Sequence, residues 1–201
     1  MEKCSLIDYP GKIAAVVFTQ GCNLNCSFCH NRQLIPLESS SPLLPVEEVL
    51  ETLRERRGFL DAVVISGGEP TLQEGLVDFL AQVRSLGFAT KLDTNGTRPE
   101  VIKSLLKQRL LDFIAMDLKA PLARYSEICG AKVDLAAVKA SVRIIRQAGI
   151  EHQFRTTMIP QLSERDVQRM EKDSEGIDHW IGQRFRAPSG QSLDVVADKL
   201  S

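Results

Sequence analysis

Residues 21–31 read GCNLNCSFCHN and place Cys22, Cys26 and Cys29 within eight residues, directly after an apolar, β-branched run that ends near Gln20. Three thiols at such short spacing are too close together for an ordinary disulfide framework, and they indicate a metal site instead. A loop that directly follows a strand lies at the carboxyl end of that strand. We therefore predict a thiolate loop at the carboxyl edge of a sheet.

The spacing by itself leaves two metals open. Thiolates favour zinc or iron-sulfur clusters. Structural zinc normally takes four protein ligands, but His30 directly follows Cys29 and is badly placed, and Cys4 and Cys129 are remote in the chain. Three local ligands favour a 4Fe-4S cluster with one iron left open, and a structural zinc site is the alternative. We interpret Cys4 and Cys129 as ordinary buried or half-exposed thiols.

The composition is that of one ordinary globular domain, which we expect to span residues 1–201. The chain has 43% hydrophobic residues, and 25 Lys and Arg face 26 Asp and Glu, for a formal net charge of −1. This balance supplies no basic field for nucleic acid. The longest apolar runs are far shorter than the roughly 20 residues that span a membrane. The first residues, MEKCSLIDYPGK, do not resemble a secretory signal, so we expect a cytoplasmic protein without a nucleic-acid or membrane partner.

Outward from the cysteine loop, β-branched segments alternate with segments of helical period. This alternation is typical of βαβ units around a parallel sheet. The predicted strands are Ile13–Gln20, Ala62–Ser66, Ala89–Thr94, Phe113–Asp117, Gln153–Ile159 and Trp180–Phe185. The predicted helices are Val46–Arg57, Gly75–Leu86, Pro99–Gln108, Leu135–Ala148 and Glu164–Lys172.

Six such units are too few for a closed eight-unit barrel, which takes about 250 residues. The fold class that we predict is α/β, a partial (β/α)6 open barrel resembling a TIM barrel, with a parallel sheet in a single domain. Its active site should lie at the carboxyl ends of the strands. Asp134 and Ser163 stand where helix N-caps belong, and Gly87 and Gly149 stand where helices end.

Three further motifs stand at the ends of the next predicted strands. Ser66-Gly67-Gly68-Glu69-Pro70 closes the second strand, where adjacent glycines permit positive φ and close approach of the backbone to a ligand, and Glu69 offers an acceptor for an ammonium group. Leu92-Asp93-Thr94-Asn95-Gly96 and Met116-Asp117-Leu118-Lys119 close the third and fourth strands. An ordinary turn also explains such motifs. However, acidic residues at the ends of neighbouring parallel strands should lie close together at the carboxyl edge of the sheet.

The cysteine spacing, with aromatic Phe28 just before the third cysteine, resembles the signature of the radical S-adenosylmethionine (SAM) superfamily. The phrases SLIDYPGK, SGGEPT, LDTNG, MDLK and RTTMIP extend the resemblance over almost the whole chain. They are most similar to the activating proteins of anaerobic ribonucleoside-triphosphate reductase. Activases of pyruvate formate-lyase and related enzymes share several of these phrases.

The resemblance implies a role for each matching residue. Cys22, Cys26 and Cys29 would ligate one 4Fe-4S cluster, whose open iron binds the amino and carboxylate groups of SAM. Phe28 would lie near the adenine. The cofactor-binding set would comprise Gly67, Gly68, Glu69, Asp93, Thr94, Asn95, Asp117 and Lys119, with Asp93, Thr94 and Asp117 beside a monovalent cation. Arg155 and Asp8 would each be catalytic residues, with Arg155 lining the SAM pocket and facing the docked peptide, and Asp8 lying near the incoming glycine loop of the partner.

The activity implied is activation of a glycyl radical enzyme. In this family, one electron from the reduced cluster cleaves SAM, and the 5'-deoxyadenosyl radical removes a hydrogen atom from a glycine of the partner enzyme. The resemblance implies anaerobic ribonucleotide reductase as that partner and, by analogy, flavodoxin or ferredoxin as the electron donor. The alternatives are activation of another glycyl radical enzyme such as pyruvate formate-lyase, a radical SAM enzyme that modifies a small molecule or RNA, and a non-catalytic zinc protein.

Overall fold

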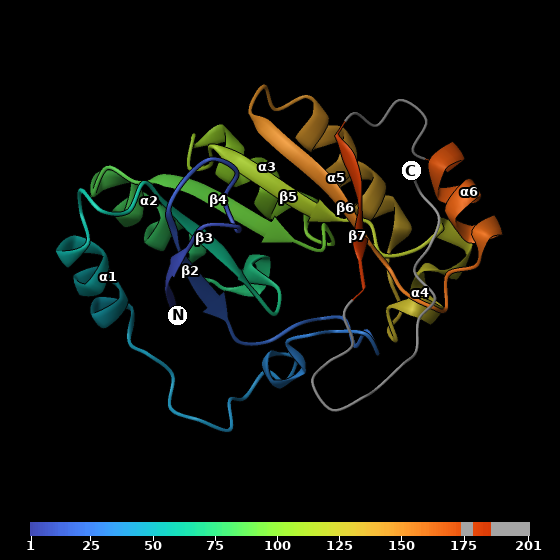
Figure 1. Ribbon diagram of the computed structural model, residues 1–201, viewed down its shortest axis with the longest axis horizontal. Helices are drawn as coiled ribbons and strands as arrows, with labels where there is room; N and C mark the ends of the chain where they lie inside the picture. Colours follow the sequence, from blue (N-terminus) through green and yellow to red (C-terminus); the bar gives the residue numbers. More distant parts are fainter. Residues whose placement is uncertain (174–178, 186–201) are drawn as a thin grey trace.

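The computed structural model describes residues 1–173 and 179–185, which contain one seven-stranded sheet. Its strands are β1 (Glu2–Ser5), β2 (Ala14–Thr19), β3 (Ala62–Gly67), β4 (Ala89–Thr94), β5 (Phe113–Asp117), β6 (Glu151–Met158) and β7 (Trp180–Arg184). The strands lie side by side in chain order, and all neighbours from β2 to β7 are parallel (Figure 1). The predicted α/β class with a parallel sheet is confirmed.

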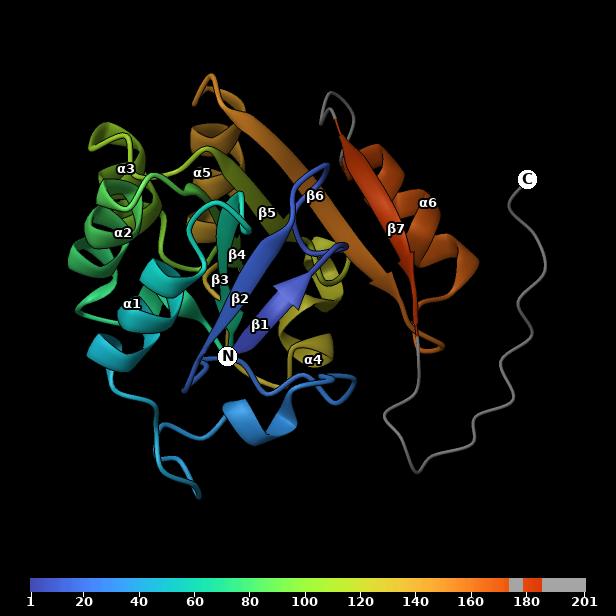
Figure 2. The same ribbon diagram turned by 60° about the vertical axis from the view of Figure 1, so that its left-hand side comes forward.

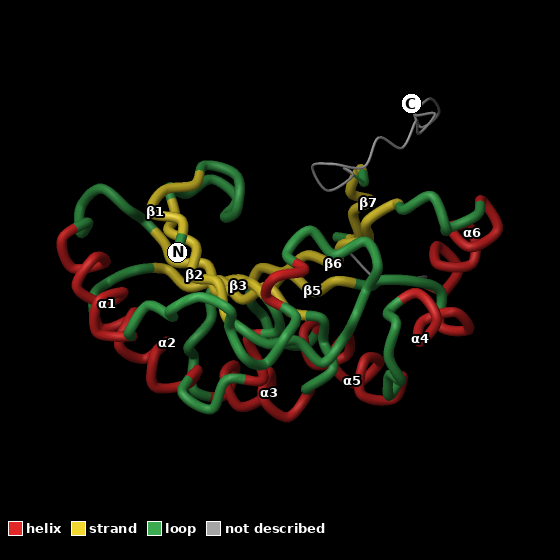
Figure 3. The backbone as a smooth tube through the Cα atoms, turned by 90° about the horizontal axis from the view of Figure 1, so that it is seen from below, coloured by secondary structure: helices red, strands yellow, loops and turns green. Residues whose placement is uncertain are grey.

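The helices cover one side of this sheet. They are α1 (Val46–Glu55), α2 (Leu76–Ser85), α3 (Pro99–Lys107), α4 (Tyr125–Ile128), α5 (Leu135–Arg146) and α6 (Glu164–Asp173), with short 3-10 helices η1 (Arg32–Leu34), η2 (Pro70–Leu72) and η3 (Leu122–Arg124). Figure 3 shows the strands in an arc with α1 to α6 along its outer side. In the described part of the chain, β1 and β7 are the two ends of the strand order and do not pair, so the barrel is open.

The predicted helix ends agree with the structure because their capping residues act as expected. The Asp134 carboxylate accepts hydrogen bonds from the backbone amides of Ala136 and Ala137 at the start of α5. The Ser163 hydroxyl accepts one from the amide of Asp166 at the start of α6. Gly87 and Gly149, after α2 and α5, have positive φ, a conformation that glycine adopts without steric cost.

The two faces of the sheet are packed differently. Outward-facing side chains such as Ile65, Leu92 and Phe154 form the core against the helices. Inward-facing side chains at the amino ends of the strands are also apolar, and the Tyr9 ring packs edge-on against Phe113 there with 5.7 Å between ring centroids. The inner face therefore has an apolar floor at the amino ends of the strands.

Two elements differ from the prediction. Strand β1 was not predicted, because Glu2–Ser5 carries no apolar alternation; it pairs antiparallel with β2 and extends the sheet by one strand. Helix α4 was missed because a single turn is too short to show a helical period. Trp180, the first residue of β7, is half-buried, and its indole N–H donates to Thr156 Oγ1 at 2.9 Å. None of the helices in the described residues has the length and apolar character needed to cross a bilayer.

Candidate active site

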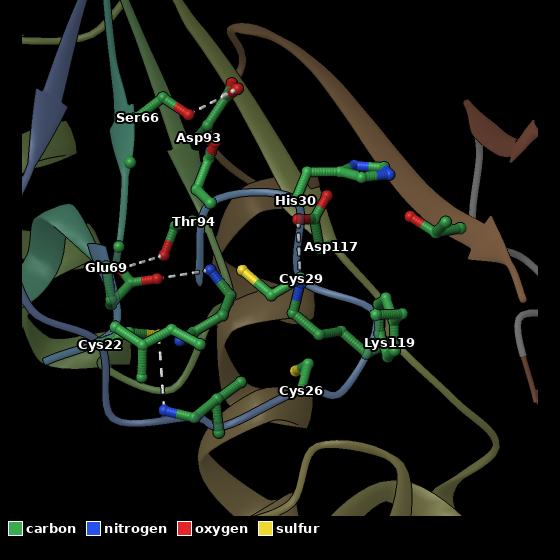
Figure 4. A pocket seen from close by; sticks show the side chains of 18 of the residues that line it. Cys22, Cys26, Cys29, His30, Ser66, Glu69, Asp93, Thr94, Asp117 and Lys119 are labelled. Carbon is green, nitrogen blue, oxygen red and sulfur yellow. Dashed lines mark hydrogen bonds and ion pairs between the residues drawn. The ribbon is translucent and has the colours of Figure 1, made fainter. Parts of the chain in front are cut away.

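A pocket lies at the carboxyl ends of β3, β4, β5 and β6, where Figure 4 shows the cysteine loop folded over the sheet. It gathers all but one of the residues predicted for the site. Its lining includes Cys22, Cys26, Phe28, Cys29, Gly67, Gly68, Glu69, Asp93, Thr94, Asn95, Asp117, Lys119 and Arg155. Segments separated by more than a hundred residues in the chain thus meet at one mouth because parallel strands end at the same edge of the sheet.

Backbone hydrogen bonds hold the cysteine loop in place. The amide of Cys22 donates to the Ile35 carbonyl at 3.0 Å, and that of Cys29 donates to the Cys26 carbonyl at 3.1 Å. Arg32 Nη1 also donates to the Cys26 carbonyl, at 3.0 Å. On the other side of the loop, the amide of Asn25 donates to the carbonyl of Cys129, after α4, at 2.9 Å. The loop is therefore positioned from two directions.

The three cysteines of this loop form no disulfide and all line the pocket. Cys26 is buried, while Cys22 and Cys29 are partly exposed. Among residues 1–173 and 179–185, no three His, Cys, Asp or Glu side chains are close enough together to hold one metal ion. Three free thiols that share one pocket match the donor set of an iron-sulfur cluster.

The adjacent glycines Gly67 and Gly68 also pack against the chain after β2. Gly67 has a φ of +110°, as predicted for this turn. A Cβ at Gly67 would lie 2.4 Å from the Thr19 backbone nitrogen, and one at Gly68 would lie 2.1 Å from the Gly21 carbonyl oxygen. Both glycines line the pocket, but what excludes a side chain at each is the backbone at the end of β2. Their observed role is to let this turn pack against the start of the cysteine loop.

The carboxylate of Glu69 joins two strand ends. Its Oε1 accepts hydrogen bonds from the Thr71 amide at 3.1 Å and the Thr94 hydroxyl at 2.7 Å, and its Oε2 accepts one from the Asn95 amide at 2.7 Å. The side chain is fully buried, and this burial raises its pKa although the donors oppose the shift. The expectation that Glu69 accepts from an ammonium group stays a prediction. In the structure, its carboxylate ties the turn after β3 to the turn after β4.

Asparagine side chains join the same turn to the cysteine loop. The Asn95 side-chain amide donates to Asn23 Oδ1 at 2.9 Å, and that of Asn23 donates to Thr97 Oγ1 at 2.8 Å. Phe28 is buried at the pocket wall. The cysteine loop, the turn after β3 and the turn after β4 are thus connected through side chains as well as backbone.

The inner side of the pocket carries four charged groups in contact. Arg155 donates to Asp117 Oδ1 at 2.9 Å and to Asp93 Oδ2 at 3.3 Å, and Lys119 donates to Asp117 Oδ2 at 3.1 Å. Burial alone would raise the pKa of Asp117, but the neighbouring Arg155 and Lys119 cations hold it down at about 2. The Asp117 charge in turn raises the pKa of both Lys119 and Arg155 despite their burial. All three groups therefore carry charge at neutral pH.

Asp8 is the one predicted residue that does not reach the pocket. β1 and β2 are antiparallel with Ser5 opposite Ala14, so the turn between them lies at the amino end of β2. Figure 2 shows this turn at the far end of the sheet from η1. The Asp8 carboxylate accepts a hydrogen bond from the Ser5 hydroxyl. The prediction of Asp8 as a catalytic residue beside the pocket is corrected, because the direction of the hairpin places Asp8 at the opposite end of the sheet.

Two residues were not identified as parts of the site. Lys91 forms an ion pair with Asp93, which lies two residues closer to the carboxyl end of β4. The sequence could have indicated this contact, because residues two apart on a strand share a face. Cys129 hydrogen-bonds to Cys26, and this bond lowers the pKa of the Cys26 thiol. No local signal links Cys129 to the cysteine loop, because about a hundred residues separate them and only the packing of α4 brings them together.

The comparisons with known proteins agree with this geometry. Residues 16–173 match the model of the Radical SAM superfamily. A protein of Methanocaldococcus jannaschii designated a glycyl-radical enzyme activating enzyme is 37% identical over 187 residues, which cover 90% of this chain and 76% of that protein. Pyruvate formate-lyase-activating enzyme of Clostridium pasteurianum is 36% identical over 124 residues, which cover 59% of this chain and 50% of that enzyme.

A solved structure shares the fold. Streptococcus suis SuiB bound to S-adenosylmethionine superimposes with a TM-score of 0.69 at 19% identity, over 88% of this chain and 41% of that chain. The matched region thus covers less than half of the length of SuiB. In the clostridial enzyme it covers half of the length.

Proposed function

Because this chain belongs to the radical SAM superfamily, whose members use a 4Fe-4S cluster and SAM, we propose that it is an activase that generates a glycyl radical on a partner enzyme. The observation that carries the proposal is that three free thiols and charged groups from four neighbouring strands, β3 to β6, and the turns that follow them line one pocket. A non-catalytic zinc protein would leave those charged groups without a joint purpose.

Cys22, Cys26 and Cys29 would hold the cluster. When bound, the reduced cluster and SAM together supply a carbon-centred radical that can remove a hydrogen atom from a glycine Cα. The chain itself supplies position and charge. Its contribution is to hold the reacting groups close together and to exclude side reactions.

The charged side chains suit a zwitterionic ligand such as SAM. Lys119 and Arg155 are partly exposed to the pocket, with 18% and 16% of their side-chain area accessible, and both are held in place by Asp117. Cations fixed in this way can accept a carboxylate without reorganising. Glu69, by joining the turns after β3 and β4, would keep that side of the pocket rigid.

The partner that we propose is anaerobic ribonucleotide reductase, with flavodoxin or ferredoxin as the electron donor. The support is the N-terminal phrase SLIDYPGK and the compact cysteine loop, which resemble the activating proteins of that reductase. The 36% identity to a pyruvate formate-lyase-activating enzyme favours a second candidate partner, pyruvate formate-lyase.

Electron paramagnetic resonance on reconstituted protein tests both parts of the proposal. After anaerobic reduction with SAM present, we expect release of 5'-deoxyadenosine and a glycyl-radical doublet with the reductase. A doublet that forms only with pyruvate formate-lyase would show that pyruvate formate-lyase, and not the reductase, is the partner. Cleavage of SAM without any radical on either enzyme would favour a small-molecule or RNA substrate. Zinc in place of iron, with no SAM cleavage, would contradict the activase.

A further inference from the structure

Lys91 lies directly beneath the pocket and completes a row of alternating charges. Its ammonium pairs with Asp93 Oδ1 at 2.5 Å, and Arg155 and Asp117 continue the row to Lys119. These side chains point to the inner face because Lys91 and Asp93 pair in register with Phe113 and Ala115, which belong to the inner apolar cluster.

Every carboxylate oxygen of the row already accepts a hydrogen bond from a cationic side chain. Asp93 gives one oxygen to Lys91 and the other to Arg155, and Asp117 gives one to Arg155 and the other to Lys119. Three cationic side chains thus face two carboxylates, with one positive charge in excess. Sodium or potassium binds through oxygen ligands, and here it would have to share each carboxylate oxygen with a cationic side chain that repels it. The monovalent cation expected from the family resemblance does not fit these residues.

Lys91 is buried, and burial of a charged ammonium group is energetically unfavourable. The residue is 2% exposed, and its ammonium lies 5.8 Å from the centre of the Phe113 ring. A buried ammonium is unfavourable unless a counter-charge and hydrogen bonds compensate it. Asp93 supplies that counter-charge, and the Phe113 ring adds a favourable cation–π contact. Removal of Asp93 would leave the buried Lys91 ammonium without this counter-charge, whereas removal of Lys91 would leave Asp93 with Arg155 as its cationic partner.

We propose that Lys91 is a built-in counter-ion of the SAM pocket, which holds Asp93 in position and makes SAM binding independent of sodium and potassium. The inference rests on the proposed function, because it takes SAM as the ligand. Lys91 is a positioning residue, since it lies below the pocket and acts through Asp93. The excess positive charge of the row faces the pocket through Lys119 and Arg155, where it can meet the carboxylate of SAM.

The test measures the SAM dissociation constant of the cluster-loaded protein by calorimetry, with choline as the only added cation and then with potassium or sodium at equal ionic strength. We expect the parent affinity to be the same in all three buffers. Lys91→Met should weaken SAM binding about tenfold or more in choline, and potassium should restore part of the loss, because a free Asp93 oxygen becomes available. Lys103→Met, on the exposed face of α3, is the matched control and should behave as the parent.

Two results would overturn the proposal: a parent affinity that rises about tenfold with potassium or sodium, or a Lys91→Met protein whose affinity equals that of the parent in choline. Thallium NMR on the parent protein tests the counter-ion without SAM and without a variant that might misfold. Binding of thallium at the pocket would contradict the proposal, and its absence would support it. If the parent binds no SAM in any buffer, the proposed function fails, and the thallium result still decides the role of Lys91.

Discussion

Glu69 and Asn95, on neighbouring strand ends, are joined by a hydrogen bond of 2.7 Å from the Asn95 amide to the buried Glu69 carboxylate. This bond connects the turn that contacts the cysteine loop with the turn that carries Asp93. The shape of the pocket therefore depends on a carboxylate that has no exposed surface of its own.

Glu69→Gln should destabilise the protein. The glutamine amide group would meet donors where the carboxylate accepted hydrogen bonds, and a buried polar group left unpaired costs about 1–3 kcal/mol. Urea unfolding of the parent and the variant measures the difference. Glu74→Gln, an exposed position nearby, is the control. Equal unfolding midpoints for Glu69→Gln and the parent would show that the bond is not important for stability.

Cys26→Ala should abolish cluster assembly, because the loop offers only three local thiols. Iron and sulfide per chain after anaerobic reconstitution measure the effect. Cys4→Ala, which changes an exposed thiol on β1, should assemble the cluster as the parent does. A full iron content in Cys26→Ala would remove Cys26 from the ligand set.

Asp93→Ala should keep the cluster and weaken SAM binding. The variant removes the partner of Lys91 and one partner of Arg155, so the pocket loses the group that fixes both cations. Iron content and the SAM dissociation constant, measured on the same preparation, separate the two effects. If Asp93→Ala binds SAM as tightly as the parent, our assignment of the pocket is wrong.

Cys129→Ala should lower the reduction potential of the cluster by tens of millivolts. The Cys129 thiol hydrogen-bonds to Cys26, and hydrogen bonds to ligating sulfur stabilise the reduced, more negative cluster. A potentiometric titration followed by electron paramagnetic resonance gives the midpoint. Cys129→Ser keeps a donor and should lie between the parent and Cys129→Ala. Identical midpoints in all three proteins would contradict a contact between Cys129 and the cluster.

Tyr9→Phe should make the protein less sensitive to alkali. Burial, with added repulsion from Asp112 and Glu151, raises the pKa of Tyr9 to about 12 in the folded state, against about 10 when unfolded. The stability that this shift contributes is complete below about pH 10 and is lost as the pH rises towards 12. Urea midpoints of the apo protein across this range should fall more steeply for the parent than for the variant. Parallel curves would show that Tyr9 ionises as in the unfolded chain.

The resemblance to the radical SAM signature could be recognised in the sequence, but contacts that run between strands could not. Lys91 stands two residues before Asp93 in the predicted strand Ala89–Thr94. This spacing indicates that both side chains share a face of the sheet. Nothing local showed that Arg155 would reach both Asp93 and Asp117, because that depends on the register of β6 against β5. Asp8 was misplaced for a related reason, since the unpredicted strand β1 reverses the chain away from the pocket.

The order of strands and helices was determined by local sequence, because apolar periodicity and capping residues such as Asp134 act within a few residues of themselves. The cysteine spacing likewise determined that three thiols share one loop. Which groups surround those thiols was decided only by tertiary structure. Parallel strands bring their carboxyl ends to one edge, and this pairing joins Glu69 to Asn95, Cys129 to Cys26 and Lys91 to the charged row, since contacts between distant segments depend on strand register and helix packing rather than on neighbouring residues.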